Sequence, residues 1–154
     1  MPPAKAEIER RERIESYLDQ GKENSFLKHP KIAEAVQDAL LHFDQVRYRL
    51  HAWVVMPNHV HSLFTPGMGH SLSGILQSWK SYAAKEANRF LGRRGRFWQE
   101  DYFDRYIRNP THFEAAIEYI ELNPVKAGLC VAAKEWSYSS ATRQKLTDSE
   151  IRAK

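Results

Sequence analysis

Two histidines, His59 and His61, stand two residues apart in the segment MPNHVHSLF. In a β-strand, residues i and i+2 point to the same face, so the two imidazoles would project together. Neutral imidazole binds Mn²⁺, Zn²⁺ and similar ions, but two ligands are too few for a stable site. The pair therefore indicates a metal site completed by other groups, a site that handles phosphate, or two histidines without a chemical role.

Three known histidine patterns do not fit this segment. A histidine-triad nucleotide hydrolase needs a further histidine where Leu63 stands, and a two-histidine phosphoesterase needs two copies of His-x-Ser/Thr. The His-Glu-x-x-His pattern of a zinc protease does not occur in the sequence either. A metal clamp that is open to a phosphate remains.

A tyrosine and an asparagine lie one helical turn apart in the segment AAIEYIELNPVKAGL, at Tyr119 and Asn123. A phenol is a weak nucleophile because its ordinary pKa is about 10. A metal ion that neutralised the phosphate charge would allow Tyr119 to attack phosphorus, and the Asn123 oxygen is a plausible third ligand. The alternatives are an ordinary tyrosine of an amphipathic helix, or Tyr102 or Tyr106 as the nucleophile.

Basic residues are concentrated in one part of the chain. The 154 residues include 23 Lys and Arg against 19 Asp and Glu, for a net charge of +4. The basic residues between Trp79 and Arg108 are Lys80, Lys85, Arg89, Arg93, Arg94, Arg96, Arg105 and Arg108. A local excess of this kind suits a polyanion partner, although a solvated face is the alternative.

The composition excludes several classes of protein. A single cysteine, Cys130, excludes an intramolecular disulfide and a multi-cysteine zinc site. The apolar runs are too short to span a membrane, and the charged N-terminus lacks the apolar stretch of a signal peptide. We therefore expect a cytoplasmic protein that has no membrane partner.

The first half of the chain must position the histidines. Residues 4–19 alternate charges at helical spacing, which predicts a weakly amphipathic helix. A second helix is expected to open at Pro30. Residues 47–55 are rich in β-forming residues, and residues 60–65 read as their antiparallel partner after a turn at 57–58.

The second half must position the tyrosine. Apolar residues at helical spacing predict a helix from about residue 71 that Gly92 ends, followed by an extended segment at 97–108. Another helix is expected to begin near Asn109-Pro110-Thr111, with the Thr111–Glu114 pair in the form of a capping box, and to end at Pro124. These elements predict one α/β (α+β) domain with an antiparallel sheet covered by helices.

Three ordered blocks of the chain resemble a known family. They are MPNHVHSLF, then SWKSYAAKEANRFLGRRGRFWQEDYFDRYIRNPTHFEAAIEYIELNPVKAGL, and finally WSYSSA. They look like the REP-associated tyrosine transposases, which belong to the single-tyrosine HUH, IS200-like transposases. The resemblance implies a ferredoxin-like HUH domain over residues 26–141, after a helical extension at 1–25 and before a polar tail at 142–154.

The resemblance also implies an activity. Such enzymes cleave single-stranded DNA near hairpins with Mg²⁺ or Mn²⁺, keep a covalent 5′-phosphotyrosine link, release a 3′-hydroxyl and can rejoin strands. By resemblance, His59, His61 and Asn123 are the metal ligands and Tyr119 is the nucleophile. Tyr102 and Tyr106 lack the polar residue that the family places four positions later.

The expected partner is single-stranded or hairpin DNA, bound by a monomer or a homodimer. The basic residues would contact phosphates, and an aromatic side chain would stack on unpaired bases. The DNA-binding candidates are Lys80, Arg93, Arg94, Arg96, Trp98, Arg105 and Arg108.

One departure from the family is expected. Relatives commonly begin with an apolar β-strand, whereas this chain begins with a charged segment that reads as a helix. We therefore expect a sheet that lacks the N-terminal strand. This leaves open a second function, a decayed or domesticated protein that binds DNA hairpins without cutting them. A metal-dependent hydrolase of small phosphoesters is a third possibility.

Overall fold

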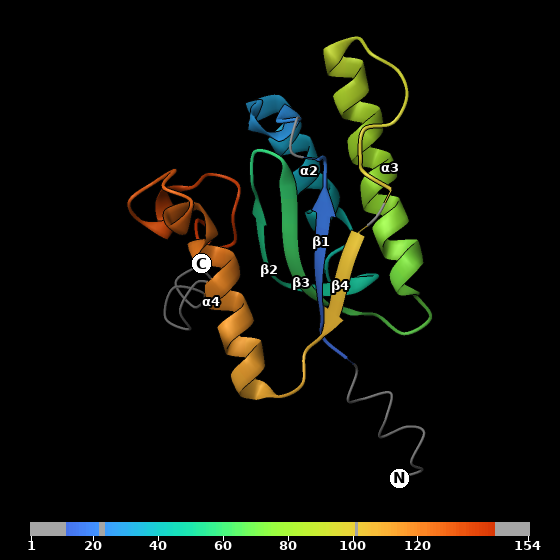
Figure 1. The fold of residues 1–154 in the computed structure, drawn as a ribbon. Helices are drawn as coiled ribbons and strands as arrows, with labels where there is room; N and C mark the ends of the chain where they lie inside the picture. The colour runs from blue at the N-terminus through green and yellow to red at the C-terminus, as the bar shows by residue number, and fades with distance from the viewer. Residues whose placement is uncertain (1–11, 22–23, 101, 144–154) are drawn as a thin grey trace, which may run out of the picture.

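The computed structural model describes residues 12–21, 24–100 and 102–143, which fold around one sheet (Figure 1). The elements are β1 (Ile14–Asp19), η1 (Phe26–Lys28), α2 (Pro30–His42), β2 (Tyr48–Val55), β3 (His59–Pro66), α3 (Leu72–Leu91), β4 (Tyr102–Tyr106), α4 (Pro110–Lys126) and η2 (Ala133–Glu135). The strand order is β2-β3-β1-β4, and all neighbours are antiparallel. Two interleaved β-α-β units give this order, so the predicted ferredoxin-like fold is confirmed.

The N-terminal strand is present, which corrects the expectation that the sheet lacks it. Residues 14–19 pair with β3 on one side and with β4 on the other, so this strand is interior. The predicted helix over 4–19 is therefore wrong for 14–19, and residues 4–11 lie outside the described residues. The domain boundary expected at residue 25 is wrong for the same reason, because residues 14–19 belong to the sheet of the domain.

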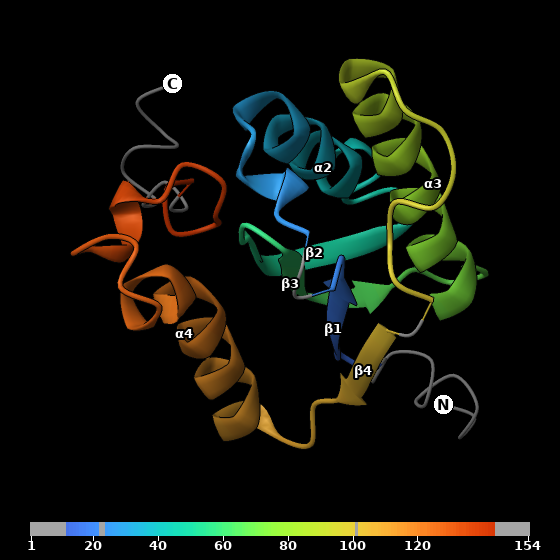
Figure 2. The same ribbon diagram turned by 45° about the horizontal axis from the view of Figure 1, so that its top comes forward.

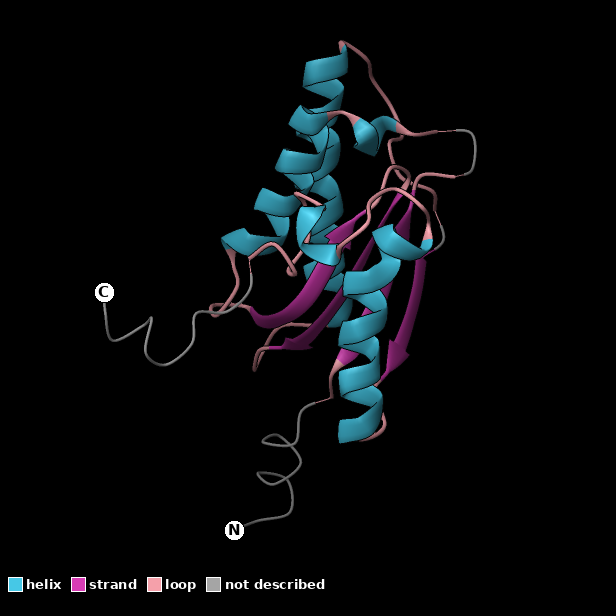
Figure 3. Ribbon diagram, turned by 90° about the vertical axis from the view of Figure 1, so that its left-hand side faces the viewer, coloured by secondary structure: helices cyan, strands magenta, loops and turns pink. Residues whose placement is uncertain are grey.

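The sheet has two different faces. Ile14 and Leu18 on β1 point toward α2 and α3, and they join the larger hydrophobic core. Glu15 and Tyr17 alternate with them and must point to the opposite face, toward α4. Figures 2 and 3 show this three-layer arrangement, with α2 and α3 on one side of the strands and α4 on the other.

The helices on the first face begin and end as their sequence predicts. Pro30 occupies the first turn of α2, where its missing N–H leaves no partner unsatisfied. The Ser71 hydroxyl accepts a hydrogen bond from the Gly74 N–H at the start of α3. Gly92 ends α3 with φ of 66°, a left-handed conformation that favours glycine.

The ends of α4 differ from the prediction. The cap is Asn109, whose side-chain oxygen accepts a hydrogen bond from the His112 N–H at 2.8 Å, so the expected Thr111–Glu114 capping box is wrong. The helix also continues through Pro124 to Lys126. Proline removes only one backbone donor, and the tertiary contacts of α4 carry the helix past it.

Candidate active site

The helix α4 covers one part of its sheet face and leaves another part open. Ala116 and Ile120 pack against Ala52, Val54 and Leu63 of β2 and β3. Between α4 and the neighbouring strands β1 and β4 lies a cleft of about 360 Å³. The residues that line it are Glu15, Tyr17, His61, Phe103, Arg105, His112, Ala115, Ala116 and Tyr119.

The histidine pair lies on β3 and faces α4, as the strand spacing predicted. His61 is 5% exposed, and His59 stacks on the Tyr17 ring with centroids 4.5 Å apart. Burial and, to a smaller extent, the neighbouring His61 together lower the pKa of His59 to about 4. His59 is therefore neutral at neutral pH, which is the form that binds metal ions.

The predicted nucleophile reaches the histidine pair. The Tyr119 ring lies edge-on to the His61 ring with centroids 5.6 Å apart, and the tyrosine remains 51% exposed. Asn123 follows one turn later and is partly buried. Because α4 runs unbroken through Pro124 to Lys126, these two side chains share one side of the helix.

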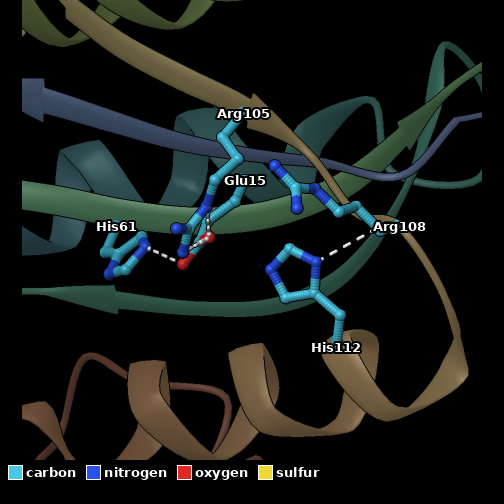
Figure 4. Close-up of polar contacts among 5 residues, drawn as sticks. All are labelled: Glu15, His61, Arg105, Arg108 and His112. Carbon is cyan, nitrogen blue, oxygen red and sulfur yellow. Dashed lines mark hydrogen bonds and ion pairs between the residues drawn. The ribbon is translucent and has the colours of Figure 1, made fainter.

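A buried carboxylate completes the inner end of the cleft. Figure 4 shows Glu15 between His61 and Arg105. One oxygen of Glu15 lies 2.7 Å from His61 Nε2, and the other accepts hydrogen bonds from Arg105 Nε and Nη2 at 2.9 and 2.6 Å. Burial by itself raises the pKa of Glu15, but the hydrogen bonds and charges of His61 and Arg105 outweigh it, so the pKa lies below the ordinary value.

The competing tyrosines are placed less well for chemistry. Burial raises the pKa of Tyr17, and Asp19 and Tyr119 raise it further, which disfavours the phenolate. Tyr106 pairs with Ile14 and therefore shares its face of the sheet, away from the histidines. Tyr102 holds the register position opposite Leu18. Tyr119 is the tyrosine that the geometry favours.

Arg108 and His112 supply two further hydrogen-bond donors beside the cleft. The Arg108 side chain extends toward Arg105 and His112 (Figure 4). The Arg108 backbone N–H donates a hydrogen bond to His112 Nδ1 at 3.1 Å. The neutral His112 ring therefore carries its proton on Nε2, where it can donate to a bound group.

The sequence prediction missed Glu15, Tyr17 and His112. The alternation in IESYLD contained a signal for the first two, since Ile14 and Leu18 alternate with polar residues as in a strand. The helical reading of the flanking charges hid this signal. Nothing in the sequence near His112 set it apart.

The remaining predicted DNA contacts are spread over other parts of the protein. Arg94 and Arg96 are exposed in the loop after α3, on the side of the sheet opposite α4 (Figure 2). Arg93 in that loop donates hydrogen bonds to Asn88 Oδ1 and the Arg96 carbonyl. Lys80 lies on α3 and is partly buried.

The structure does not support Trp98 as a base-stacking residue, which is a correction to the prediction. Its side chain is only 5% exposed and belongs to the core under α2 and α3. Its indole N–H donates to the Lys80 carbonyl. A ring packed in this way has no free face for a base.

The donor set fits a divalent ion. His59 and His61 supply imidazoles on one face, and His61 Nδ1 is buried without a hydrogen-bond partner among the described residues. Within the same residues, no group of three or more His, Cys, Asp and Glu side chains is arranged to hold a metal. Two imidazoles with oxygen ligands, such as the amide oxygen that the sequence predicts at Asn123, would suit Mn²⁺.

The fold and this cleft together define the class of protein. The family model "Transposase IS200 like" matches residues 23–123, and the chain belongs to this family. The family predicted from the sequence is thereby confirmed.

Two curated relatives show which members of this family the chain resembles. The chain is 28% identical over 96 residues to the REP-associated tyrosine transposase of Escherichia coli, an alignment that covers 62% of this chain and 56% of the relative. It is 25% identical over 99 residues to a Haemophilus influenzae protein provisionally assigned to the same group, covering 58% of this chain and 56% of that one. The chain thus spans little more than half the length of the curated relatives it matches.

A solved structure shows the same fold. A REP-associated tyrosine transposase bound to a REP hairpin superposes with a TM-score of 0.65 over 86% of this chain and 78% of that chain, at 22% identity. In the described part of this chain, no helix is long and apolar enough to cross a membrane.

Proposed function

We propose that this protein cleaves single-stranded DNA beside a hairpin and transfers the strand through a covalent bond to Tyr119. The observation that carries the proposal is the contact between the Tyr119 and His61 rings within one cleft. Membership of the IS200-like family supports it, as does the likeness to a relative described as bound to a REP hairpin.

The chemical step is an exchange of one phosphoester bond for another. The Tyr119 phenol oxygen attacks the scissile phosphorus and loses its proton. The new bond joins tyrosine to the 5′-phosphate, and the bond to the 3′-oxygen breaks, so that this oxygen leaves as a 3′-hydroxyl after taking up a proton. The reverse reaction with another 3′-hydroxyl would rejoin strands.

The chain supplies both positioning and positive charge for this step. His59, His61 and Asn123 would hold Mg²⁺ or Mn²⁺, and a bound ion would supply Lewis-acid polarisation of the phosphate. His112 lines the cleft together with Tyr119, and the Arg108 side chain extends toward His112, so both residues can donate to a phosphate oxygen bound there. Exposure of half of the Tyr119 side chain leaves the nucleophile accessible to the DNA.

The test is covalent capture on a labelled hairpin oligonucleotide that carries single-stranded flanks. With Mn²⁺, the wild-type protein should give an adduct that survives denaturing electrophoresis. Tyr119→Phe should give none, and Tyr106→Phe, a matched control on the opposite face, should behave as wild type. An adduct in Tyr119→Phe would refute the nucleophile, and undiminished cleavage in His61→Ala would refute the metal clamp.

The non-cleaving hairpin-binding protein now has no observation in its favour. It was motivated by the expected absence of the N-terminal strand, and that strand lies within the sheet. Hairpin binding without an adduct under any divalent metal would restore it.

A further inference from the structure

Glu15 is a charged residue in a place where charge is costly. It is 2% exposed, in the interior strand β1, and it lies opposite Leu63 of β3 and Arg105 of β4. A buried carboxylate is tolerated when hydrogen-bond donors satisfy both of its oxygens. Here Arg105 satisfies one oxygen and His61 the other.

The Arg105 contact fixes the charge on Glu15. The guanidinium is charged at any ordinary pH, and it donates two hydrogen bonds to the same carboxylate oxygen. Both the hydrogen bonds and the charge favour the ionised acid. An ionised carboxylate can only accept hydrogen bonds.

The charge on Glu15 then determines where His61 carries its proton. The 2.7 Å contact joins Glu15 to His61 Nε2, so Nε2 must be the nitrogen that carries hydrogen. In the neutral ring, Nδ1 is left with a free lone pair. That atom is buried and has no hydrogen-bond partner among the described residues, so its lone pair is available to a Lewis acid.

We propose that Glu15 and Arg105 are positioning residues for His61, which fix its Nε2–H tautomer and leave Nδ1 as the nitrogen that binds the metal ion. This inference rests on the proposed metal-dependent function and names residues outside the predicted ligand set. Carboxylates behind metal-binding histidines fix the tautomer and the ring orientation and raise the basicity of the ligand. Tyr119 contacts the same His61 ring. Glu15 and Arg105 therefore also orient His61 relative to the nucleophile.

The first experiment uses the metal-free full chain and needs no DNA. Nitrogen-15 NMR of labelled histidine, at about pH 8 and so above the ordinary imidazole pKa, separates protonated from bare ring nitrogens. We expect His61 to show a protonated Nε2 and a bare Nδ1, and the Glu15→Gln variant to lose this single-tautomer pattern. A protonated Nδ1 in the wild type would overturn the inference and leave the proposed strand transfer standing.

The second experiment measures metal binding without catalysis. Adding Zn²⁺, a diamagnetic probe, should shift the His61 Nδ1 signal, and Mn²⁺ titration followed by electron paramagnetic resonance gives the dissociation constant. We expect Glu15→Gln and Arg105→Gln to weaken Mn²⁺ binding by about 10- to 100-fold, as for other residues that support a metal ligand. Asp104→Asn, an exposed carboxylate beside Arg105 on β4, is the matched control and should bind Mn²⁺ as wild type does.

The outcomes separate this inference from the proposed function. Metal binding through Nε2, or unchanged Mn²⁺ affinity in both variants, would refute the positioning role while adduct formation by the wild type upheld the enzyme. A wild-type chain that binds neither ion would refute both. Arg105 is half-exposed on an edge strand, so its variant gives the decisive affinity if Glu15→Gln does not fold.

Discussion

The Tyr119 ring on α4 meets the His61 ring on β3 edge-on, with centroids 5.6 Å apart and ring planes at 74°. The two residues are far apart in the sequence. Their contact places the candidate nucleophile and the candidate metal ligand in one site that a single chain forms. A site formed in this way does not require a helix from a second molecule. The contact depends on how α4 packs against the sheet.

The packing of α4 on the sheet can be tested at Ile120. This side chain is fully buried against β2 and β3, one residue after Tyr119. We expect Ile120→Ala to lower the free energy of unfolding by about 2–5 kcal/mol, because it leaves a cavity under the helix. Urea denaturation measures this change, and the partly buried Ile117→Ala should cost less. Equal effects of the two substitutions would show that α4 does not depend on the Ile120 contact.

The pH dependence of stability should carry the signature of His59. The unfolded chain protonates this residue near its ordinary pKa of 6.5, whereas the folded protein resists protonation until about 4. The unfolded state therefore binds more protons in this interval, so stability is full above about 6.5 and falls as the pH drops toward 4. The loss is on the order of 3 kcal/mol, at 1.36 kcal/mol for each pKa unit.

This pH effect is measured by chemical denaturation of the metal-free protein. His59→Asn should flatten the curve between these two values, because the titrating group is gone. A wild-type curve that is flat there, or a mutant curve that keeps its slope, would contradict the prediction. Glu15 contributes in a lower interval, since its pKa lies below the ordinary carboxyl value.

The metal affinity should depend on Asn123. If its amide oxygen is the third protein ligand, Asn123→Ala should weaken Mn²⁺ binding while leaving the fold intact, since the side chain is only partly buried. Calorimetry or electron paramagnetic resonance measures this loss. Glu118→Ala, an exposed residue of the same helix, is the matched control. Equal Mn²⁺ affinity in the two variants would remove Asn123 from the site.

Arg108 and Arg94 should affect different properties: both should contribute to DNA binding, and only Arg108 to the rate of adduct formation. The Arg108 side chain extends toward Arg105 and His112, which line the cleft, whereas Arg94 lies in the loop after α3, on the side of the sheet opposite α4. If each contacts one phosphate, each alanine variant lowers the slope of log affinity against log salt by about 0.7–0.9. Only Arg108→Ala should also slow adduct formation at saturating DNA, which a time course on the hairpin substrate measures. Equal slowing by Arg94→Ala would argue that the DNA wraps both faces.

The sequence predicted those parts of the structure that depend on local pattern. The alternation around His59 and His61 predicted their shared face, and the periodicity of α2 and α3 predicted these helices together with the glycine that ends the second. The quoted blocks predicted the family and the roles of Tyr119 and Asn123. The family is confirmed, and the two roles stay predictions.

Errors arose where tertiary contacts override local preference. The segment around Glu15 carries charges at helical spacing, and an isolated chain would give no reason to bury a glutamate. In the protein, pairing on both sides forms a strand, and His61 and Arg105 satisfy the carboxylate. Trp98 likewise stands among arginines in the sequence, but the core beneath α2 and α3 encloses it.

The sequence by itself thus determined which residues face together on one strand and one helix, because the periods of two and 3.6 residues are properties of the backbone. Only the tertiary structure decided that the strand and the helix meet. It also decided that Glu15, from a segment expected to lie outside the domain, stands behind His61. The reason is that pairing between distant strands, and the burial of charge that it permits, depends on partners that local spacing does not encode.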